Sequence, residues 1–271
     1  EGGVDGQFTV TQTAISSTDT VVSYSVGGTA TAGTDYATLS GSVTIPAGST
    51  AATIDVAGIV NDLIVEADET VDITLTGIVS GDAQIDLDGD PLNLADTVTI
   101  VDNDSATVSI SADADGVEGG VDGQFTVTQT AVSSTDTVVS YLVGGTATAG
   151  TDYATLSGSV TIPAGSTTAT IDVSVIDDPI VEADEIVLVS LDGLTADPDV
   201  TFDTDPFNLL DALTIVDNDS ATVSISADAD GVEGGVDGQF TVTQTAISST
   251  DTVVSYSVGG TATAGTDYAT L

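Results

Sequence analysis

The chain has 271 residues and a formal net charge of −43, because its 43 aspartates and glutamates are accompanied by no lysine or arginine. It also contains no histidine or cysteine, which excludes disulfide frameworks, zinc fingers, haem ligation and thiol or imidazole catalysis. Without basic residues, binding to nucleic acid or to an anionic membrane surface is not expected. Such a charge often indicates disorder, but a mean hydropathy of +0.31 and 41% hydrophobic residues are enough for a folded core.

The first 39 residues open a repeat. They recur without change at 233–271, and a near copy begins at Glu118 with Val132 in place of Ile15 and Leu142 in place of Ser25. A 232-residue pair of similar domains therefore repeats, and we expect the chain to be an interior part of a long tandem array. We predict a domain at 1–104 that lacks its first strand, a complete domain at 105–219, and the N-terminal part of a third at 220–271.

The complete unit carries a pattern of short β-strands. Runs rich in Val, Ile and Thr alternate apolar with polar residues and are separated by turn signals such as Gly144-Gly145 and Asp192-Gly193. The predicted strands cover residues 106–112, 124–130, 137–143, 159–163, 168–175, 186–191 and 212–216. Seven strands in one unit are typical of an immunoglobulin-like sandwich of two sheets. No long apolar run predicts a membrane span.

Three aromatic positions recur in register in each unit, and we expect them to lie in the core: Phe8, Phe125, Phe240, Tyr24, Tyr141, Tyr256, Tyr36, Tyr153 and Tyr268. One unit ends at Asp104 or Asp219, and the next strand begins only two residues later. We therefore predict an all-β chain of sandwich domains stacked end to end without linkers. The third unit stops after its third predicted strand and cannot close a sandwich alone.

The glutamates are confined to two motifs, E-G-G and I-V-E-A-D-E. These motifs, together with G-T-D-Y and V-D-N-D, follow every second strand. Such connections lie at the same end of an antiparallel sandwich, so we expect nine carboxylates of the complete unit to converge there: Glu118, Asp152, Asp177, Asp178, Glu182, Asp184, Glu185, Asp217 and Asp219.

Converging carboxylates need a source of positive charge. Two of them ~4.5 Å apart repel by roughly 3–4 kcal/mol at an effective dielectric of ~20, whereas a domain is stable by only ~5–15 kcal/mol. Oxygen ligands without nitrogen or sulfur favour Ca²⁺ over transition metals, and irregular loops favour it over Mg²⁺. We expect about two to four Ca²⁺ at this end of each complete domain.

The run G-T-A-x-x-G-x-D-Y at 145–153, V-I-D-D-x-x-x-E at 175–182 and the closing D-N-D at 217–219 resembles the Calx-beta domain. That domain is known from the regulatory loop of sodium–calcium exchangers and from tandem arrays in large bacterial surface proteins. The resemblance implies immunoglobulin-like sandwiches with clustered Ca²⁺ at the end where the last strand leaves.

The resemblance also implies metal ligands at matching positions. In the middle domain they are Glu118, Asp152, Asp177, Asp178, Glu182, Glu185, Asp217 and Asp219. In the first domain they are Glu1, Asp35, Asp62, Glu66, Glu69, Asp102 and Asp104, and the third retains Glu233 and Asp267. Asn61 stands where the middle domain has Asp177, which removes one charge from the first site.

Plainer interpretations of the same motifs stay open. V-D-N-D and G-T-D-Y can be simple turns, and the acids can form a halophilic surface without a specific site. The loop before the last strand carries further aspartates, which either complete the metal cluster of the preceding domain or lie in solvent: Asp88, Asp90, Asp203 and Asp205.

The leading functional hypothesis is a calcium-stabilised segment of a secreted or cell-surface protein. It would form a rigid rod, either an adhesin stalk or a self-assembling extracellular filament, with neighbouring repeats as its partners. The absence of lysine and arginine removes trypsin-type cleavage points, which suits exposure outside the cell. The alternative is a Ca²⁺-sensing regulatory module. A glycosidase-like pair of carboxylates is disfavoured because the acids recur in every unit, so we expect no enzyme.

Overall fold

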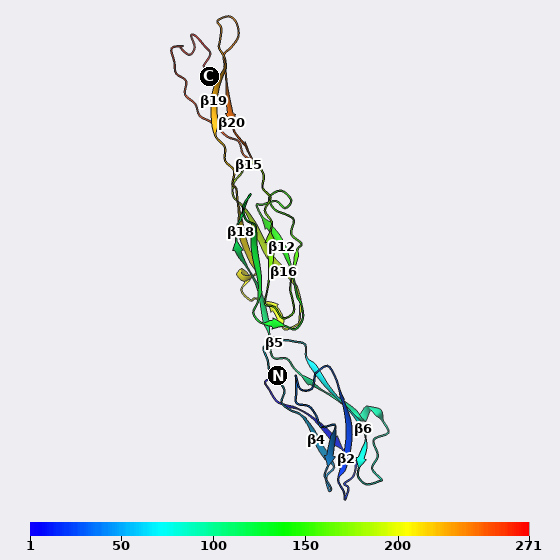
Figure 1. Cartoon of the computed structure of the whole chain (residues 1–271). Helices are drawn as coiled ribbons and strands as arrows, with labels where there is room; N and C mark the ends of the chain where they lie inside the picture. Colours follow the sequence, from blue (N-terminus) through cyan, green and yellow to red (C-terminus); the bar gives the residue numbers. More distant parts are fainter. Residues whose placement is uncertain (271) are drawn as a thin grey trace.

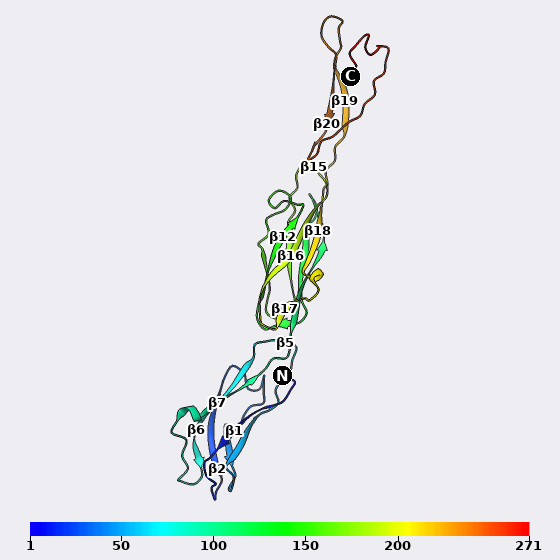
Figure 2. The ribbon, with the colours of Figure 1, turned by 180° about the vertical axis from the view of Figure 1, so that it is seen from behind.

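The computed structural model describes residues 1–270 as three β-sheet units that follow one another along a line (Figure 1). The view from behind shows the same end-to-end arrangement (Figure 2). In both views the N-terminus lies near the joint between the first and middle units, and the C-terminus lies in the unit farthest from the first. Among residues 1–270, the structure contains no helix with the length and hydrophobicity that a membrane-spanning segment requires.

The middle unit is a sandwich of two sheets. One sheet has the order β14-β10-β8-β17 and the other β13-β12-β16-β18-β9. The first contains β8 (Ala106–Ala114), β10 (Gly123–Gln129), β14 (Thr168–Val173) and β17 (Val200–Phe202). The second contains β9 (Gly116–Val117), β12 (Thr137–Gly145), β13 (Ser159–Ile162), β16 (Glu185–Thr195) and β18 (Leu210–Val216). All seven strands predicted for this unit are confirmed, and the short strands β9 and β17 extend the sheets.

Alternating side chains explain why these strands form a sandwich. Every second residue of β10 is buried, including Phe125 and Val127 at 0% exposure, while the residues between them are less buried. The facing sheet contributes buried residues such as Val139, Val187 and Leu213 to the same cluster. The period-two pattern thus places one face of each sheet against the other.

The first unit repeats this plan with fewer strands. Its sheets have the orders β1-β4 and β3-β2-β6-β7. They contain β1 (Gly6–Thr11), β2 (Thr20–Gly27), β3 (Ser42–Ile45), β4 (Ala51–Val56), β6 (Glu69–Ser80) and β7 (Ala95–Ile100). The edge of β1 that corresponds to the β8 edge of β10 has no strand paired with it among residues 1–270. Single turns of 3-10 helix, η1 (Pro91–Asn93) and η2 (Pro206–Leu209), precede the last strand of the first two units.

In the third unit, the strands formed by the described residues are β19 (Val223–Ala229), β20 (Gln239–Gln244) and β21 (Ile247–Ser248). The third strand expected here, the counterpart of β12 at residues 252–258, is absent from the described structure. In the middle unit β12 pairs with β13 and β16, and residues 220–270 contain no counterpart of either strand.

The aromatic prediction is confirmed in two units and wrong in part for the third. Six of the nine side chains are at most 6% exposed: Phe8, Tyr24, Tyr36, Phe125, Tyr141 and Tyr153. Phe240 and Tyr256, in contrast, are 66% and 68% exposed, because in this unit residues 220–270 do not form two facing sheets that could bury them.

Two short parallel strand pairs connect neighbouring units. The strand β5 (Ile64–Val65) of the first unit pairs with β11 (Val132–Ser133) of the middle unit. In the same way, β15 (Ile180–Val181) of the middle unit pairs with β21 of the third. The units are therefore joined by backbone pairing as well as by the continuous chain.

Candidate metal centre

Four separate segments of the middle domain bring carboxylates to the end that faces the third unit. Glu118 follows β9, and Asp152 lies between β12 and β13. Residues 174–184 connect β14 to β16 and include β15, which marks this joint in Figure 1. Asp217 and Asp219 follow the end of β18. The antiparallel order of the strands thus places these loops together.

Within this end of the domain, six carboxylates form two groups of three. One group is Glu118, Asp217 and Asp219, and the other is Asp152, Glu182 and Glu185. In each group one oxygen from every residue lies within 4.8 Å of the others. Glu118 and Asp152 are only 5% and 6% exposed, so water screens their charges poorly.

Asp217 holds the loops of this cluster together through its two oxygens. Its Oδ2 accepts a hydrogen bond from the backbone N–H of Glu182 at 2.7 Å, and its Oδ1 accepts one from the N–H of Asp219 at 2.8 Å. The backbone N–H of Asp217 in turn donates to Oδ1 of Asp184 at 3.3 Å. Asp184 therefore helps to position Asp217, and it does not belong to either group of three.

Asn218 and Gly119 are positioning residues that the sequence analysis missed. The Asn218 side-chain amide donates to the Glu118 carbonyl and, at 3.0 Å, to Oδ1 of Asp177. Gly119 has a φ of +57°, and a Cβ at this position would lie 2.7 Å from that same Asp177 oxygen. Both residues belong to motifs that recur along the sequence, Asn218 to D-N-D and Gly119 to E-G-G, and this recurrence could have identified them.

The crowding of carboxylates raises several of their pKa values. Burial, reinforced by the charges of Asp217 and Asp178, raises the pKa of Glu118 from 4.5 to about 7. Burial, together with hydrogen bonding to Asp152 and its charge, raises the pKa of Glu185 to about 7. The pKa of Glu182 is raised by burial and by Asp178. Several carboxyl groups at this end thus resist ionisation when no cation is bound.

Asp177 and Asp178 complete the rim of the same end. They line a shallow hollow together with Gly119, Pro179, Asn218 and Asp219. Oδ1 of Asp178 accepts the N–H of Ile180 at 2.8 Å, which holds the start of β15. The structure thus places all eight residues implied as middle-domain ligands at one end, six of them in the two groups.

The first domain has a related arrangement at the end facing the middle domain. Its group of three is Glu1, Asp62 and Asp104. Asp102 makes the same kind of contacts as Asp217: its side-chain oxygens accept hydrogen bonds from the backbone N–H groups of Glu66 at 2.7 Å and Asp104 at 3.0 Å. Among the described residues, Asp62 rather than Asp102 completes the group with Glu1.

The second group is less complete in the first domain. The three counterparts Asp35, Glu66 and Glu69 do not all come within 4.8 Å of one another in the described chain. Burial, the Asp35 charge and a hydrogen bond to Asp35 nevertheless raise the pKa of Glu69 to about 7. In the third unit Glu233 and Asp267 are exposed, and neither belongs to a group among residues 1–270.

The donor set fits a hard divalent cation. Three carboxylate oxygens in these groups are buried without a hydrogen-bond partner: Glu118 Oε2, Asp219 Oδ2 and Asp104 Oδ2. The chain offers no lysine, arginine or histidine that could neutralise them, and no nitrogen or sulfur side-chain ligand that a transition metal would favour. Carboxylate clusters on irregular loops match the coordination that Ca²⁺ takes in proteins.

The aspartates in the loop before the last strand do not belong to the metal groups. Asp88 accepts hydrogen bonds from the N–H of Asp90 at 2.8 Å and from the Asn93 side chain at 3.1 Å. Asp203 accepts the equivalent bonds from its own loop, and in both cases these bonds lower the pKa of the carboxyl group. Within residues 1–270, neither residue joins a group of three.

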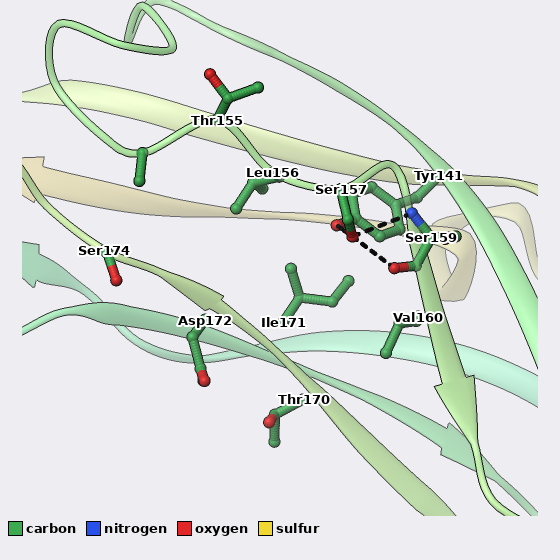
Figure 3. Close-up of a pocket in the computed structure, with 11 residues that line it drawn as sticks. Tyr141, Thr155, Leu156, Ser157, Ser159, Val160, Thr170, Ile171, Asp172 and Ser174 are labelled. Atoms are coloured by element: carbon green, nitrogen blue, oxygen red, sulfur yellow. Dashed lines mark hydrogen bonds between the residues drawn. The ribbon is translucent and has the colours of Figure 1, made fainter.

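A second hollow lies on the side of the middle domain, where the segment 154–159 crosses between the sheets (Figure 3). The hydroxyl groups of Tyr141 and Ser157 are hydrogen-bonded to each other. The Ser157 hydroxyl also donates to the carbonyl of Ser159 and accepts a hydrogen bond from the backbone N–H of Ser159. Its only acid is Asp172, which accepts a hydrogen bond from Gln124. A single carboxylate among hydroxyl and apolar side chains does not form a catalytic pair.

The sequence of the chain matches a known domain family. The family profile of the Calx-beta domain matches residues 2–104, 111–225 and 217–271. A comparison with curated protein sequences finds no significant match.

Solved structures with some likeness include the apo-form Calx CBD1 domain, with 24% identity over 42% of this chain and 99% of that chain and a TM-score of 0.35. The calcium binding domain CBD12 of CALX1.1 shares 17% identity over 78% of this chain and 92% of its own, with a TM-score of 0.33. Since the family profile spans nearly the whole sequence in three successive segments, the chain belongs to the Calx-beta domain family and consists of tandem Calx-beta repeats.

Proposed function

We propose that the chain is a calcium-stabilised structural segment of a secreted or cell-surface protein, in which successive domains form a rigid rod. This proposal rests on one observation: at the end of the middle domain that faces the third unit, six carboxylate residues form two clusters of three. Buried oxygens there lack hydrogen-bond partners, and the chain has no basic side chain to offset them.

Bound Ca²⁺ would supply the positive charge that the chain itself does not contain. In the middle domain, Glu118, Asp217 and Asp219 would hold one ion. Asp152, Glu182 and Glu185 would hold another. Asp177 and Asp178, which line the adjacent hollow, offer further ligands, so about two to four ions per complete domain is our expectation.

The place of the site favours a mechanical role. Asp62 and Glu66 of the first domain lie on the same loop as strand β5, which pairs with the following domain. Cations bound at Asp62 and at Glu66 would therefore hold the segment between these residues, which carries the joint. Reduced repulsion and a fixed loop would both stiffen the array.

An extracellular location agrees with the affinities that such sites have. Extracellular calcium modules bind with dissociation constants of about 10⁻⁴ to 10⁻³ M, so millimolar Ca²⁺ outside the cell occupies about half to nine-tenths of such sites. The absence of lysine and arginine also leaves no cleavage point for trypsin-like proteases. Neighbouring repeats of the same chain are the partners that this role requires.

Small-angle X-ray scattering of the chain in 1 mM Ca²⁺ and in EGTA, at equal ionic strength, tests the proposal. We expect the scattering of a straight rod in Ca²⁺ and a distribution of shorter, bent shapes in EGTA. Equal scattering curves in the two buffers would contradict a stiffening role. Electron microscopy of a longer array then separates an adhesin stalk, which stays single, from a filament, which associates laterally.

A further inference from the structure

The joint between the first and middle domains contains a strand pair that crosses the domain boundary. Ile64 pairs with Val132 and Val65 with Ser133 in a parallel ladder. The backbone N–H of Ser134 donates to the carbonyl of Val65 at 3.0 Å. The loop of one domain thus adds two residues of backbone to the next.

The Val65 side chain belongs to the core of the domain that follows it. Val65 is 0% exposed and is part of the continuous apolar cluster that contains Val139 and Ile162 of the middle domain. It is not part of the first domain's own cluster, which contains Val71. Leu63, two residues earlier on the same loop, is 76% exposed. The burial of Val65 is therefore specific to this position.

The hydrogen bond of one glutamine, next to the segment that pairs with the preceding domain, differs between units with and without such a pairing. Gln129 is 1% exposed, and its side-chain amide donates to the carbonyl of Ala131 at 2.7 Å, beside β11. Gln244 makes the same bond to Ala246 beside β21. In the first domain no strand is docked within the described chain, and Gln12 donates instead to the carbonyl of Ser49.

The same segment is not a strand in the first domain. Residues 14–17 form no strand, whereas their counterparts in the other two units form β11 and β21. At the second joint the backbone bond is repeated, since the N–H of Ser249 donates to the carbonyl of Val181 at 3.1 Å. Val181 is only half-buried there, where the receiving unit contains three strands.

We propose that each domain has, at its upstream end, a docking surface for the Ile-Val strand of the preceding domain, and that Val65 completes the core of the middle domain. The stability of residues 105–219 then depends on a side chain that lies outside them. This goes beyond the proposed function, because the contact consists of apolar side chains and backbone bonds and requires no cation. Such coupling between nearest neighbours is how repeat arrays become cooperative.

Hydrogen–deuterium exchange of the whole chain, read by mass spectrometry for each domain, tests this proposal. In Val65→Ala we expect the slowest amides of the middle domain, in β10 and β16, to exchange about tenfold faster, because a buried side chain loses two methyl groups. The matched control is Val71→Ala, which makes the same change at a 0% exposed position in the first domain's core. It should speed exchange within residues 1–104 and leave the middle domain unchanged.

Leu63→Ala serves as the surface control and should alter neither domain. The proposal is overturned if Val65→Ala affects only residues 1–104, if it matches Leu63→Ala, or if Val71→Ala affects the middle domain equally. The measurement is made in Ca²⁺ and in metal-free buffer. The difference between variants tests the docked strand, whereas the difference between buffers for the unsubstituted chain tests the proposed role of Ca²⁺.

Discussion

Glu118 and Asp217 carry the same charge, but the protein holds them in different ways. Both oxygens of Asp217 accept hydrogen bonds from backbone N–H groups, which fix the position of its side chain. Glu118 is 5% exposed, and its Oε2 has no hydrogen-bond partner. In the absence of a cation, ionisation of Glu118 therefore works against folding, whereas Asp217 still connects two loops.

Glu118→Gln tests this difference. In metal-free buffer at pH 8 we expect the free energy of unfolding of the middle domain to rise by about 2 kcal/mol, because an ionised group with a pKa raised from 4.5 to about 7 is removed. In Ca²⁺ we expect at least about tenfold weaker binding, since one charged ligand is lost. Urea unfolding and calorimetry measure the two effects.

Glu233→Gln is the matched control, because Glu233 occupies the same motif in the third unit but is exposed. It should change neither the stability nor the calcium binding of the middle domain. A Glu118→Gln variant that is less stable than the unsubstituted chain without metal would contradict the account of this residue.

The pH dependence of stability follows from the same group of residues. Glu69, Glu118 and Glu185 have pKa values raised from 4.5 to about 7 in the folded chain. Between these two values the folded state binds more protons than the unfolded state, so the free energy of unfolding of metal-free protein should fall as the pH rises from 4.5 to 7. Each group contributes about 1 to 3 kcal/mol to this loss.

Saturating Ca²⁺ should reverse the sign of this dependence, because the metal binds the ionised carboxylates and stabilises the folded state more as they lose protons. Urea titrations at pH 5, 6, 7 and 8, with and without Ca²⁺, measure both slopes. Metal-free stability that increases from pH 5 to pH 8 would contradict the raised pKa values.

At the scale of elements, the loop between β14 and β16 combines two tasks. It supplies Asp177, Asp178 and Glu182 to the metal end and contains β15, which pairs with the third unit. The corresponding loop of the first domain contains β5 and has Asn61 in place of Asp177. Asn61 and Asp177 accept the same hydrogen bond, from Asn103 at 2.8 Å and from Asn218 at 3.0 Å. The two loops therefore differ by one charge on an equivalent scaffold.

Exchanging these two residues tests how that charge sets the affinity. We predict that Asn61→Asp strengthens Ca²⁺ binding by the first domain and that Asp177→Asn weakens it in the middle domain, each by about tenfold. Both variants keep the oxygen that accepts the hydrogen bond, so each is the structural control of the other. Calorimetric titration that shows equal affinities before and after the exchange would exclude these positions from the site.

The sequence was sufficient to predict the long strands, because alternation over six or more residues determines which face is buried, as in β10 around Phe125. It also predicted the loops that bring Glu118, Asp152 and Asp217 to one end, since strand direction alone determines the end. It could not predict β5 and β11, because two residues carry no periodicity and the partner strand lies in another domain. The choice of Asp62 over Asp102 as neighbour of Glu1 depends on side-chain geometry, which spacing does not encode.

At the scale of the whole molecule, a net charge of −43 is distributed along a row of domains. Exposed charges separated by more than about 10 Å are screened by salt at 0.1 M, but the grouped carboxylates at the end of the middle domain lie within 4.8 Å of one another, and Glu118 and Asp152 among them are buried, so salt screens them much less. We therefore propose that the array depends on bound cations at the domain ends rather than over the acidic surface in general.

Thermal unfolding in 1 mM Ca²⁺ and in EGTA, at pH 7.5 and equal ionic strength, tests this central claim most directly. At a dissociation constant of about 10⁻⁴ M, 1 mM Ca²⁺ stabilises a domain by about 1.4 kcal/mol per site, so two sites contribute about 3 kcal/mol. For a domain of this size, 1 kcal/mol shifts the midpoint by about 4 °C. We therefore predict that the midpoint falls by at least about 10 °C in EGTA and that sodium chloride does not restore it. An equal midpoint in both buffers, or full recovery with sodium chloride alone, would contradict the account.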